Sequence, residues 1–498
     1  MRFKRILCAA LVAAMAAVPV LFAASCGNGG TTATTAPVSL ASGAAQQTTA
    51  SDPLAAVPAN NFNGQTFMFL DRGLEANTHW NNHDIYAESE NGASLNDAVY
   101  KRNVMVQDRY NVAIKETQVN ANNISSTVSK SVQAGANEYQ AIDFDMTALT
   151  PFALKGYYTD FAAMPILDLS APCWDGFVND SISINHRYLF IEGDLNIGFN
   201  DSNWIVMFDK TLSDNLGLAN QYQTVTDGTW TIDLMWQNCK AATKDLNGDG
   251  VFDETDQWGA VNQHECMYSL YASTGQHSFT KDANDMPVCA MDATSDQLTI
   301  LQDVYNFLND KSAQIKADDY SAKYPTDPWT AVNINTFKEG RALYYISPVV
   351  SVSMMRDMDA DFGLLPMPKS GAGQTDYYDT VQYNNAEVIA VPITNTDAEF
   401  TGTVLQAMGL ASADTVKTAY YDVQLKTKYA RDDDSASMLD IIFKNRIVDI
   451  GLAFNWGGCY DFYSNFSKDK SFDYASAYAK ISKKIDSDMA KAVAAFTA

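Results

Sequence analysis

The pattern of apolar and polar positions along the chain predicts strands separated by helices. Apolar residues at 65–70 are typical of a buried strand, and a shorter apolar segment at 112–114 predicts a second one. Between them, apolar residues recur at helical spacing and form one stripe: Leu95, Val99, Val106 and Tyr110. A polar helix then leads to a third strand at 141–145. Strands alternating with helices of this length predict an α/β protein with largely parallel sheets.

Two helices carry further local signals. Ser94 and Asp97 have the spacing of a capping box, in which the first side chain accepts from the backbone and the second reaches back. This spacing predicts a helix whose N-terminus is capped by Ser94. Near the end of the chain, residues 474–496 have a helical pattern with lysines on the outer surface.

The N-terminus has the parts of an export signal. Three basic residues precede an apolar run at 6–22, which ends in small residues, so we predict a signal peptide over residues 1–25. An uncleaved membrane anchor is the alternative, although the run is at the short limit for a span. The small residues before Cys26 resemble a bacterial lipobox, with Ala23 where Leu is usual. That resemblance implies lipidation of Cys26 and a protein anchored to the extracellular face of the cell membrane.

A segment without charge follows the signal. From residue 27 to residue 51 the chain consists mostly of Gly, Thr, Ala, Ser and Gln. Such a composition buries too little apolar surface to fold, so we predict a flexible tether over residues 26–56.

Composition narrows the class of the folded part. The 498 residues are 47% hydrophobic, which is ample for a large core, and their mean hydropathy of -0.19 argues against a polytopic membrane protein. The net charge of -25 argues against binding nucleic acid, because such proteins need a basic surface. Beyond Cys8 and Cys26 there remain five cysteines without CxxC spacing, which makes a zinc site unexpected and leaves disulfide pairing open.

Residues 245–256 match the spacing of an EF-hand calcium loop. Ca²⁺ takes six or more hard oxygen ligands, and this spacing places them around one point. Gly250 supplies the sharp turn, and Asp256 stands where Glu is common, which resembles dockerin loops. The alternative is an acidic surface turn without an ion. We predict a structural Ca²⁺ site with these ligands: Asp245, Asn247, Asp249, the Val251 carbonyl, Asp253 and Asp256.

Several short segments, taken in their order, resemble the extracellular solute-binding proteins of bacterial ABC transporters. The resemblance extends from Asn61 to the C-terminus and is nearest to family 1, the maltose-binding-protein-like carbohydrate branch. The matching segments are GYYTDF at 156–161, EGDL at 192–195, GTWT at 228–231, FKEGRAL at 337–343, DFGLLPMP at 361–368 and KYARD at 428–432.

The resemblance implies a two-lobe, type II periplasmic-binding-protein-like fold with a hinge and a ligand cleft between the lobes. The chain is expected to cross between lobes near 193–200, 361–365 and 412–418. Lobe one then comprises 57–194 plus 362–412, and lobe two comprises 195–361 plus 413–498, with the calcium loop in lobe two.

The implied function is capture of a small-molecule solute, an oligosaccharide in this branch, for delivery to the permease subunits of an ABC importer. The chain has no GxSxG, GxxxxGK[ST] or HExxH motif, so we do not expect an enzyme. Its 59 acidic residues nevertheless leave a catalytic carboxylate pair open. A cell-surface glycoside hydrolase or a carbohydrate adhesin therefore remains the alternative.

Sugar recognition requires flat apolar faces for stacking, together with carboxylates and amides for the hydroxyl groups. Open α/β sheets bind ligands at the carboxyl ends of their strands, which favours residues after the predicted strands and around the crossings. Trp456 is included because it is similar in place to a late tryptophan of the family. The predicted ligand-binding residues are Asp71, Trp80, Asp145, Asp194, Trp204, Asn384 and Trp456. His79, Asn385 and Glu387 lie in the same segments.

Overall fold

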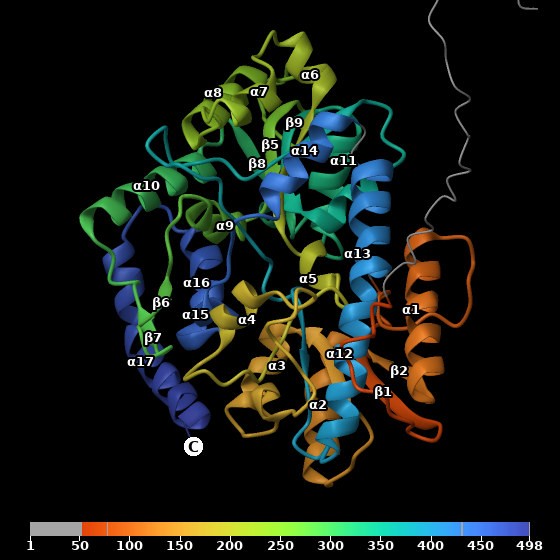
Figure 1. The fold of residues 1–498 in the computed structure, drawn as a ribbon. Helices are drawn as coiled ribbons and strands as arrows, with labels where there is room; N and C mark the ends of the chain where they lie inside the picture. The colour runs from red at the N-terminus through yellow and green to blue at the C-terminus, as the bar shows by residue number, and fades with distance from the viewer. Residues whose placement is uncertain (1–51, 77, 430–431, 498) are drawn as a thin grey trace, which may run out of the picture. The chain divides into compact units, whose positions relative to one another are not determined.

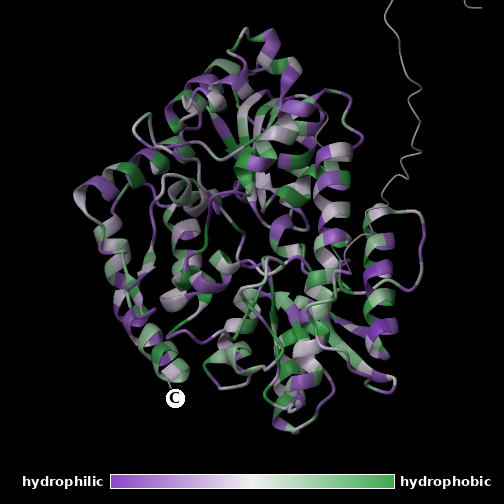
Figure 2. Ribbon diagram, in the orientation of Figure 1, coloured by the Kyte–Doolittle hydropathy of each residue, from purple (hydrophilic) through white to green (hydrophobic). Residues whose placement is uncertain are grey.

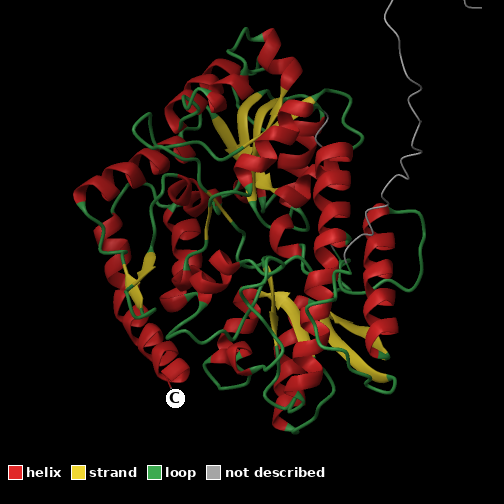
Figure 3. Cartoon of the chain, in the orientation of Figure 1, coloured by secondary structure: helices red, strands yellow, loops and turns green. Residues whose placement is uncertain are grey.

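Two mixed β-sheets, each flanked by helices, form the framework of the protein (Figure 1). The computed structural model describes residues 52–76, 78–429 and 432–497. Figure 3 shows the two sheets as separate groups of strands, with helices and loops around them. The α/β class predicted from the alternation of strands and helices is confirmed.

The first sheet has the strand order β12-β3-β1-β2. β1 is parallel to both β2 and β3, whereas β12 is antiparallel to β3. Both faces of β1 are apolar and largely buried, because helices cover the sheet on two sides. The strands are β1 Gln65–Arg72, β2 Val112–Val119, β3 Ala141–Asp145 and β12 Glu387–Ala390. The helices around them are α1 Ser94–Tyr110, α2 Ala121–Gln133, α3 Met146–Ala153 and α12 Ala398–Asp414.

The second sheet has the strand order β10-β4-β9-β5-β8. β4 is antiparallel to both of its neighbours, and β5 is parallel to β9 and β8. Its strands are β4 Trp204–Asp209, β5 Trp258–Asn262, β8 Gln314–Lys316, β9 Ala342–Pro348 and β10 Phe362–Leu365. The helices nearby are α6 Lys210–Asn215, α7 Gln221–Thr226, α8 Ile232–Ala242, α11 Asn335–Lys338 and α14 Asp433–Ile442.

A further group of helices lies beside the sheets and includes the last helix of the chain. It consists of α9 Cys266–Ser273, α10 Ser295–Asn309, α15 Ile450–Ala453, α16 Cys459–Phe466 and α17 Tyr474–Thr497, with the short strands β6 Phe279–Lys281 and β7 Pro287–Cys289. The remaining elements are α4 Gly176–Ile182, α5 Gly198–Asp201, α13 Val416–Thr418, β11 Asp379–Thr380, β13 Arg446–Ile447 and the helical turns η1 Thr78–Trp80, η2 Phe161–Ala163, η3 Ala317–Tyr320, η4 Trp329–Ile334, η5 Val349–Met355, η6 Ala419–Tyr429 and η7 Trp456–Gly458.

Two clusters of buried apolar side chains form the core. The smaller one lies against the first sheet and includes Phe67, Val106 and Phe400. The larger one includes residues of both sheets, among them Phe144 and Tyr344. Figure 2 shows hydrophobic residues along the strands, whereas helices such as α1 and α17 mix hydrophobic and hydrophilic residues along their length. This distribution is the one expected when a helix buries a single stripe against a sheet.

The expectation of largely parallel sheets holds for one sheet only. The first sheet has two parallel pairs and one antiparallel pair, whereas the second sheet has two of each. The second crossing was also misplaced, because Phe362–Leu365 pairs with β4 in the second sheet instead of entering lobe one. This apolar segment hydrogen-bonds along the edge that β4 offers, and the chain joins the first sheet again only at Glu387–Ala390.

The predicted end of the tether and the predicted N-cap of the first helix also need correction. The tether was expected to continue to residue 56, but Leu54 is 1% exposed and packs in the core beside the first sheet. The predicted capping box of Ser94 and Asp97 is not formed, because Ala93 and not Ser94 is the N-cap of α1. Asp97 instead accepts from the backbone amides of Asn91 and Gly92, which lie before the helix. The apolar stripe on α1 is confirmed, with Val99, Val106 and Tyr110 buried.

The predicted signal peptide and Cys26 lie outside the described residues. Among the helices of the described residues, none is long and apolar enough to cross a membrane. The five cysteines of the described part are unpaired thiols: Cys173, Cys239, Cys266, Cys289 and Cys459.

Candidate ligand-binding cleft

A cavity of about 580 Å³ lies where segments of the two sheets face one another. The loop after β1 contributes Thr78, His79 and Trp80 to its lining. The segments around β9 and η4 contribute Asp327, Trp329 and Pro348, and the segment before β12 contributes Gln382 and Asn385. A second cavity of about 250 Å³ shares Trp80 and Asn385 and continues between Asp84, Gly198 and Glu387. Together they form one polar cleft with two tryptophans in its wall.

Trp80 is held in this cleft by its own sheet. It is half-buried at the end of η1, directly after β1. The guanidinium of Arg72 lies 6.0 Å from the centre of the Trp80 ring, a cation–π distance. The same guanidinium donates through Nη1 to Asn385 Oδ1 at 2.8 Å. Arg72 therefore links the two lining residues and limits the movement of both.

The other wall presents Trp329, a half-buried residue at the start of η4. Asp327, two residues earlier, is exposed and lines the same cavity. Burial lowers the pKa of His79 on the opposite wall, and the negative charge of Asp327 acts against that shift. The cleft thus has an aromatic face on each side, with carboxylate and imidazole groups between them.

The segment before β12 contributes the amide side chains of Gln382 and Asn385 to the cleft. Asn385 Nδ2 donates to Gln382 Oε1 at 2.8 Å, and Gln382 Nε2 donates to Glu265 Oε2 at 2.6 Å. This chain of hydrogen bonds fixes the amide groups without using all of their donors and acceptors. Fixed amides of this kind can bind the hydroxyl groups of a ligand without losing side-chain entropy.

Asp71 and Asp145 lie beneath the cleft and are absent from the lining of either cavity. Asp71 is fully buried within β1, and burial together with the charges of Asp143 and Glu387 raises its pKa well above the ordinary value. Asp145 caps α3, because its Oδ1 accepts from the amide of Ala148 at 2.9 Å. The prediction that these side chains contact ligand directly is not supported, because neither lines a cavity of the cleft.

Asp194 and Asn384 are also placed differently from expectation. Asp194 lines another cavity of about 390 Å³, and its Oδ1 lies 2.9 Å from Lys417 Nζ. Asn384 is exposed next to Asn385, and its Oδ1 accepts from the hydroxyl of Tyr460 at 2.9 Å. Of these two residues, only Asn384 adjoins a residue that lines the cleft.

The assignment of Trp204 and Trp456 to the cleft surface was wrong. Trp204 is 0% exposed in β4, and its Nε1 donates to the Tyr268 hydroxyl at 2.7 Å. Trp456 is 1% exposed and packs against Phe279 and Phe454, with ring centroids 5.4 and 5.5 Å away. Neither ring has a face available for stacking on a ligand, because both fill the core.

The loop at 245–256 winds as its sequence suggested. Asp245 Oδ2 accepts from the amide of Gly250 at 2.9 Å, and Gly250 has a φ of +78°. Asp249 Oδ1 accepts from the amide of Val251 at 2.7 Å. Asp256 is fully buried at the end of the loop, where its two oxygens accept from the amides of Leu246 and Asp253. These hydrogen bonds fold the loop around Gly250. Among the described residues, its carboxylates do not form a group of three or more whose oxygens lie within 4.8 Å of one another.

Solved structures share this architecture at low sequence identity. An ABC substrate-binding protein from Listeria monocytogenes in complex with cycloalternan is 11% identical, with 86% of this chain and 99% of that chain covered and a TM-score of 0.53. The galacto-N-biose-/lacto-N-biose I-binding protein of the ABC transporter from Bifidobacterium longum, in complex with lacto-N-biose, is 11% identical over 87% of this chain and 98% of that chain, with a TM-score of 0.54. Apo RafE from Streptococcus pneumoniae is 12% identical over 86% and 98%, with a TM-score of 0.53. No protein-family model and no curated protein sequence matches the chain.

The fold is that of the two-lobe ABC-transporter substrate-binding proteins. The fold expected from the short sequence segments is thus confirmed. In this substrate-binding-protein fold, the cavity between Trp80 and Trp329 lies between the two sheets, where a ligand cleft is expected.

Sequence reasoning missed several residues of the cleft, above all Trp329 and Asp327. The local signal was Thr326-Asp327-Pro328-Trp329, a turn-forming segment that carries an exposed aromatic residue. Gln382 was missed because an amide before a short strand has no distinctive pattern. Asn385 and Glu387 were noted in the sequence, and both line the cleft.

Proposed function

We propose that this protein is a lipid-anchored, extracellular substrate-binding protein that captures an oligosaccharide and delivers it to an ABC importer. The observation that carries the proposal is the pairing of Trp80 and Trp329 on opposite walls of a polar interlobe cleft. Aromatic faces bury the apolar faces of pyranose rings, and amides and carboxylates bind their hydroxyl groups. Two solved proteins with this fold, those in complex with cycloalternan and lacto-N-biose, support a sugar as the ligand.

The binding role is proposed in place of catalysis. The larger cavity of the cleft combines two tryptophans with amides, an arrangement suited to holding a ligand. Lobe closure would bury the ligand between the two aromatic faces, and opening at the membrane would pass it to the permease subunits. Lipidation at Cys26 would keep the protein close to that importer.

A ligand panel tests the proposal. The purified protein is titrated with linear and cyclic oligosaccharides, and with peptides as the contrasting class, by calorimetry and tryptophan fluorescence. A cognate oligosaccharide at 100 times its Kd is expected to stabilise the fold by about 2.7 kcal/mol, and X-ray scattering should show a smaller radius of gyration. Release of reducing ends would indicate a glycoside hydrolase, binding to insoluble polysaccharide without closure an adhesin, and exclusive binding of peptides a different solute class.

We also propose a structural Ca²⁺ ion in the loop at 245–256. The sequence spacing and the turn at Gly250 support it. The proposed ligands are Asp245, Asn247, Asp249, the Val251 carbonyl, Asp253 and Asp256. When bound, the ion would supply a positive charge that compensates the carboxylates of the loop. Its role is structural, since a fully ligated Ca²⁺ has no open position for chemistry.

A further inference from the structure

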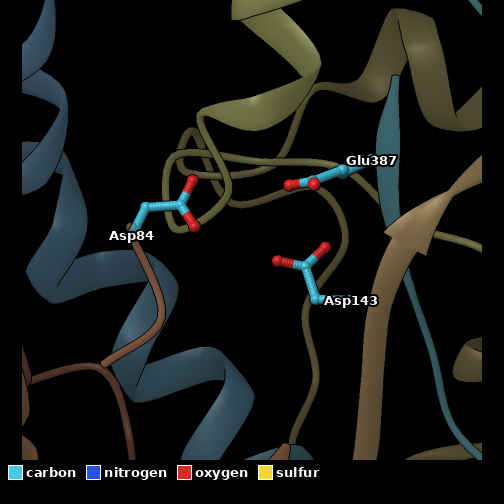
Figure 4. A group of neighbouring side chains, drawn as sticks. All are labelled: Asp84, Asp143 and Glu387. Carbon is cyan, nitrogen blue, oxygen red and sulfur yellow. The ribbon is translucent and has the colours of Figure 1, made fainter. Parts of the chain in front are cut away.

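Three buried carboxylates from distant parts of the chain converge beneath the cleft. Asp84 follows η1, Asp143 lies on β3 and Glu387 begins β12. Their exposed fractions are 1%, 0% and 3%. One oxygen from each carboxylate lies within 4.8 Å of the others, and Figure 4 shows the three groups pointing toward a common space. Among the residues described, this is the group of acidic, histidine and cysteine side chains whose geometry suits a metal ion.

Neighbouring amides hold these carboxylates in place from outside the cluster. Asn82 Nδ2 donates to Asp143 Oδ2 at 2.9 Å and to Glu387 Oε2 at 3.1 Å. Asn196 Nδ2 donates to Asp143 Oδ1 at 2.5 Å. Asp84 Oδ2 accepts from the amides of Ile197 and Gly198. All of these partners are neutral, so they orient the carboxylates without neutralising them.

The buried arginine nearby directs its hydrogen bonds elsewhere. Arg102 is fully buried, and its guanidinium donates to Asn103, to the carbonyls of Ile85 and Leu195, and to Ser412. It attracts Asp84 and Asp143 through space, and the buried Arg72 attracts Glu387. With Asp71 included, two guanidinium charges stand against four buried carboxyl groups. Burying carboxylates without compensating charge is strongly unfavourable.

Within the part of the chain that the structure describes, two buried carboxylate oxygens have no hydrogen-bond partner, which is independent evidence for a cation at this position. Asp84 Oδ1 is buried, and no hydrogen-bond partner for it occurs among the described residues. Asp71 pairs in register with Asp143 on the adjacent parallel strand, so the two side chains point to the same side of the sheet. Asp71 is 0% exposed, and its Oδ2 is equally without a partner in the described part of the chain. Native proteins rarely leave buried carboxylate oxygens unpaired.

We propose that Asp84, Asp143 and Glu387 bind a divalent cation of the Ca²⁺ type, with Asp71 beside them. The donors are all hard oxygens, which favours Ca²⁺ over zinc. One oxygen from each carboxylate lies within 4.8 Å of the others, which is compatible with an ion at about 2.4 Å from each, a usual Ca²⁺–oxygen distance.

The ion would connect the cleft to the scaffold. Asp84 lies four residues after Trp80, and both Asp84 and Glu387 line the 250 Å³ cavity. The amides of Ile197 and Gly198, which bind Asp84, belong to the segment that leads into β4 of the second sheet. A cation at this point would tie the Trp80 loop to β3, β12 and that crossing segment.

The test must separate this site from the loop at 245–256, so it uses D249A as background. Chelator-treated D249A protein is titrated with CaCl₂ alone by calorimetry, without sugar, so failure of the sugar proposal does not affect it. We expect one remaining Ca²⁺ site and a melting temperature that falls when EDTA is added. The double variant D249A/E387Q should bind Ca²⁺ at least 100-fold more weakly. D249A/E192Q is the matched control, because it neutralises another buried carboxyl and should bind Ca²⁺ as D249A does.

Either of two titration results would overturn the proposal: no Ca²⁺ binding by D249A, or equal binding by D249A and D249A/E387Q. If E387Q fails to fold, D84N replaces it. A crystal structure of the unmutated chain grown with CaCl₂ gives an answer that needs no variant. Ion density between the three carboxylates would support the site, and its absence would refute it.

Discussion

Four tryptophans of this protein differ in exposure and in their expected roles. Trp80 and Trp329 each keep part of a ring surface open to the cleft, whereas Trp204 and Trp456 are enclosed by other side chains. A stacking residue contributes to affinity through its exposed face, and a core residue contributes to stability through its packing. The two roles therefore respond differently to the same substitution.

Replacing either cleft tryptophan by alanine should weaken sugar binding. Trp80→Ala and Trp329→Ala are each expected to lose about 2 kcal/mol or more of binding free energy, roughly 30-fold in Kd, with little loss of stability. Trp204→Ala should instead cost about 3–5 kcal/mol of unfolding free energy. Calorimetry with the cognate ligand and chemical denaturation measure the two effects separately.

Trp236→Ala is the matched control for this comparison. Trp236 is half-buried like the cleft residues, but it packs in α8 near Lys240 and donates to Asp310. This variant should bind sugar normally. Normal binding by both Trp80→Ala and Trp329→Ala would show that the cleft has been assigned wrongly.

Glu192 should make stability depend on pH. Burial, together with the negative charge of Asp175, raises its pKa from 4.5 to about 8, while Arg446 opposes the shift. The folded state therefore favours the protonated acid. Its contribution to stability is complete below the unfolded pKa and is lost as pH rises from about 4.5 to about 8.

The variant Glu192→Gln removes this titration. Relative to the unmutated chain, its unfolding free energy should rise with pH by up to about 1.4 kcal/mol per unit across that window, and level off above it. Urea denaturation at several pH values provides the measurement. A stability difference that stays constant between pH 5 and pH 8 would contradict the assigned pKa.

At the scale of elements, the pairing of strands decides which sheet a segment joins. Phe362–Leu365 is short and apolar, and such a strand can join any sheet with an open edge. It pairs with β4, which keeps it in the second sheet. Packing has a similar effect at the start of the fold, since Leu54 and Val57 lie in the core beside the first sheet.

For the loop at 245–256, we predict that thermal stability depends on bound Ca²⁺. Removal of Ca²⁺ should lower the melting temperature without abolishing the fold, because carboxylates that were compensated by the ion then repel one another. Asp249→Ala should remove the part of this sensitivity that comes from the loop. Thermal unfolding with and without EDTA measures the change.

The contribution of the loop is obtained by comparison with a second variant. E387Q retains the loop, so its melting temperature should still fall with EDTA. The same EDTA-induced decrease in Asp249→Ala and in the unmutated chain would exclude a loop-bound ion.

At the scale of the whole molecule, the two sheets bring the cleft residues together. The N-terminus is proposed to anchor the protein to the membrane. Cys26 lies outside the described residues, and its lipidation rests on the sequence around it. Cys26→Ala should release the protein from the membrane or leave it unprocessed, because the thioether is the proposed anchor. Labelling with radioactive palmitate and cell fractionation measure this. Palmitate incorporation by the variant would rule out Cys26 as the lipidation site.

Local pattern was sufficient for much of the fold. The strands at 65–70, 112–114 and 141–145, the apolar stripe of α1 and the last helix are all present in the structure. The turn at Gly250 was also foreseen. These features depend on residues close together in the chain, so their spacing alone specifies them.

Only the tertiary structure decided which side chains form the cleft and the carboxylate cluster. Asp84, Asp143 and Glu387 meet because β3 pairs with β1 on one side and with β12 on the other. Trp80 and Trp329 line one cavity for a similar reason, since segments next to the two sheets each bring one of them to the cleft. By itself the sequence determined the elements and the short-range loop, because they depend on neighbouring residues. The packing of two sheets determined the site, because burial and long-range pairing are properties of the assembled fold.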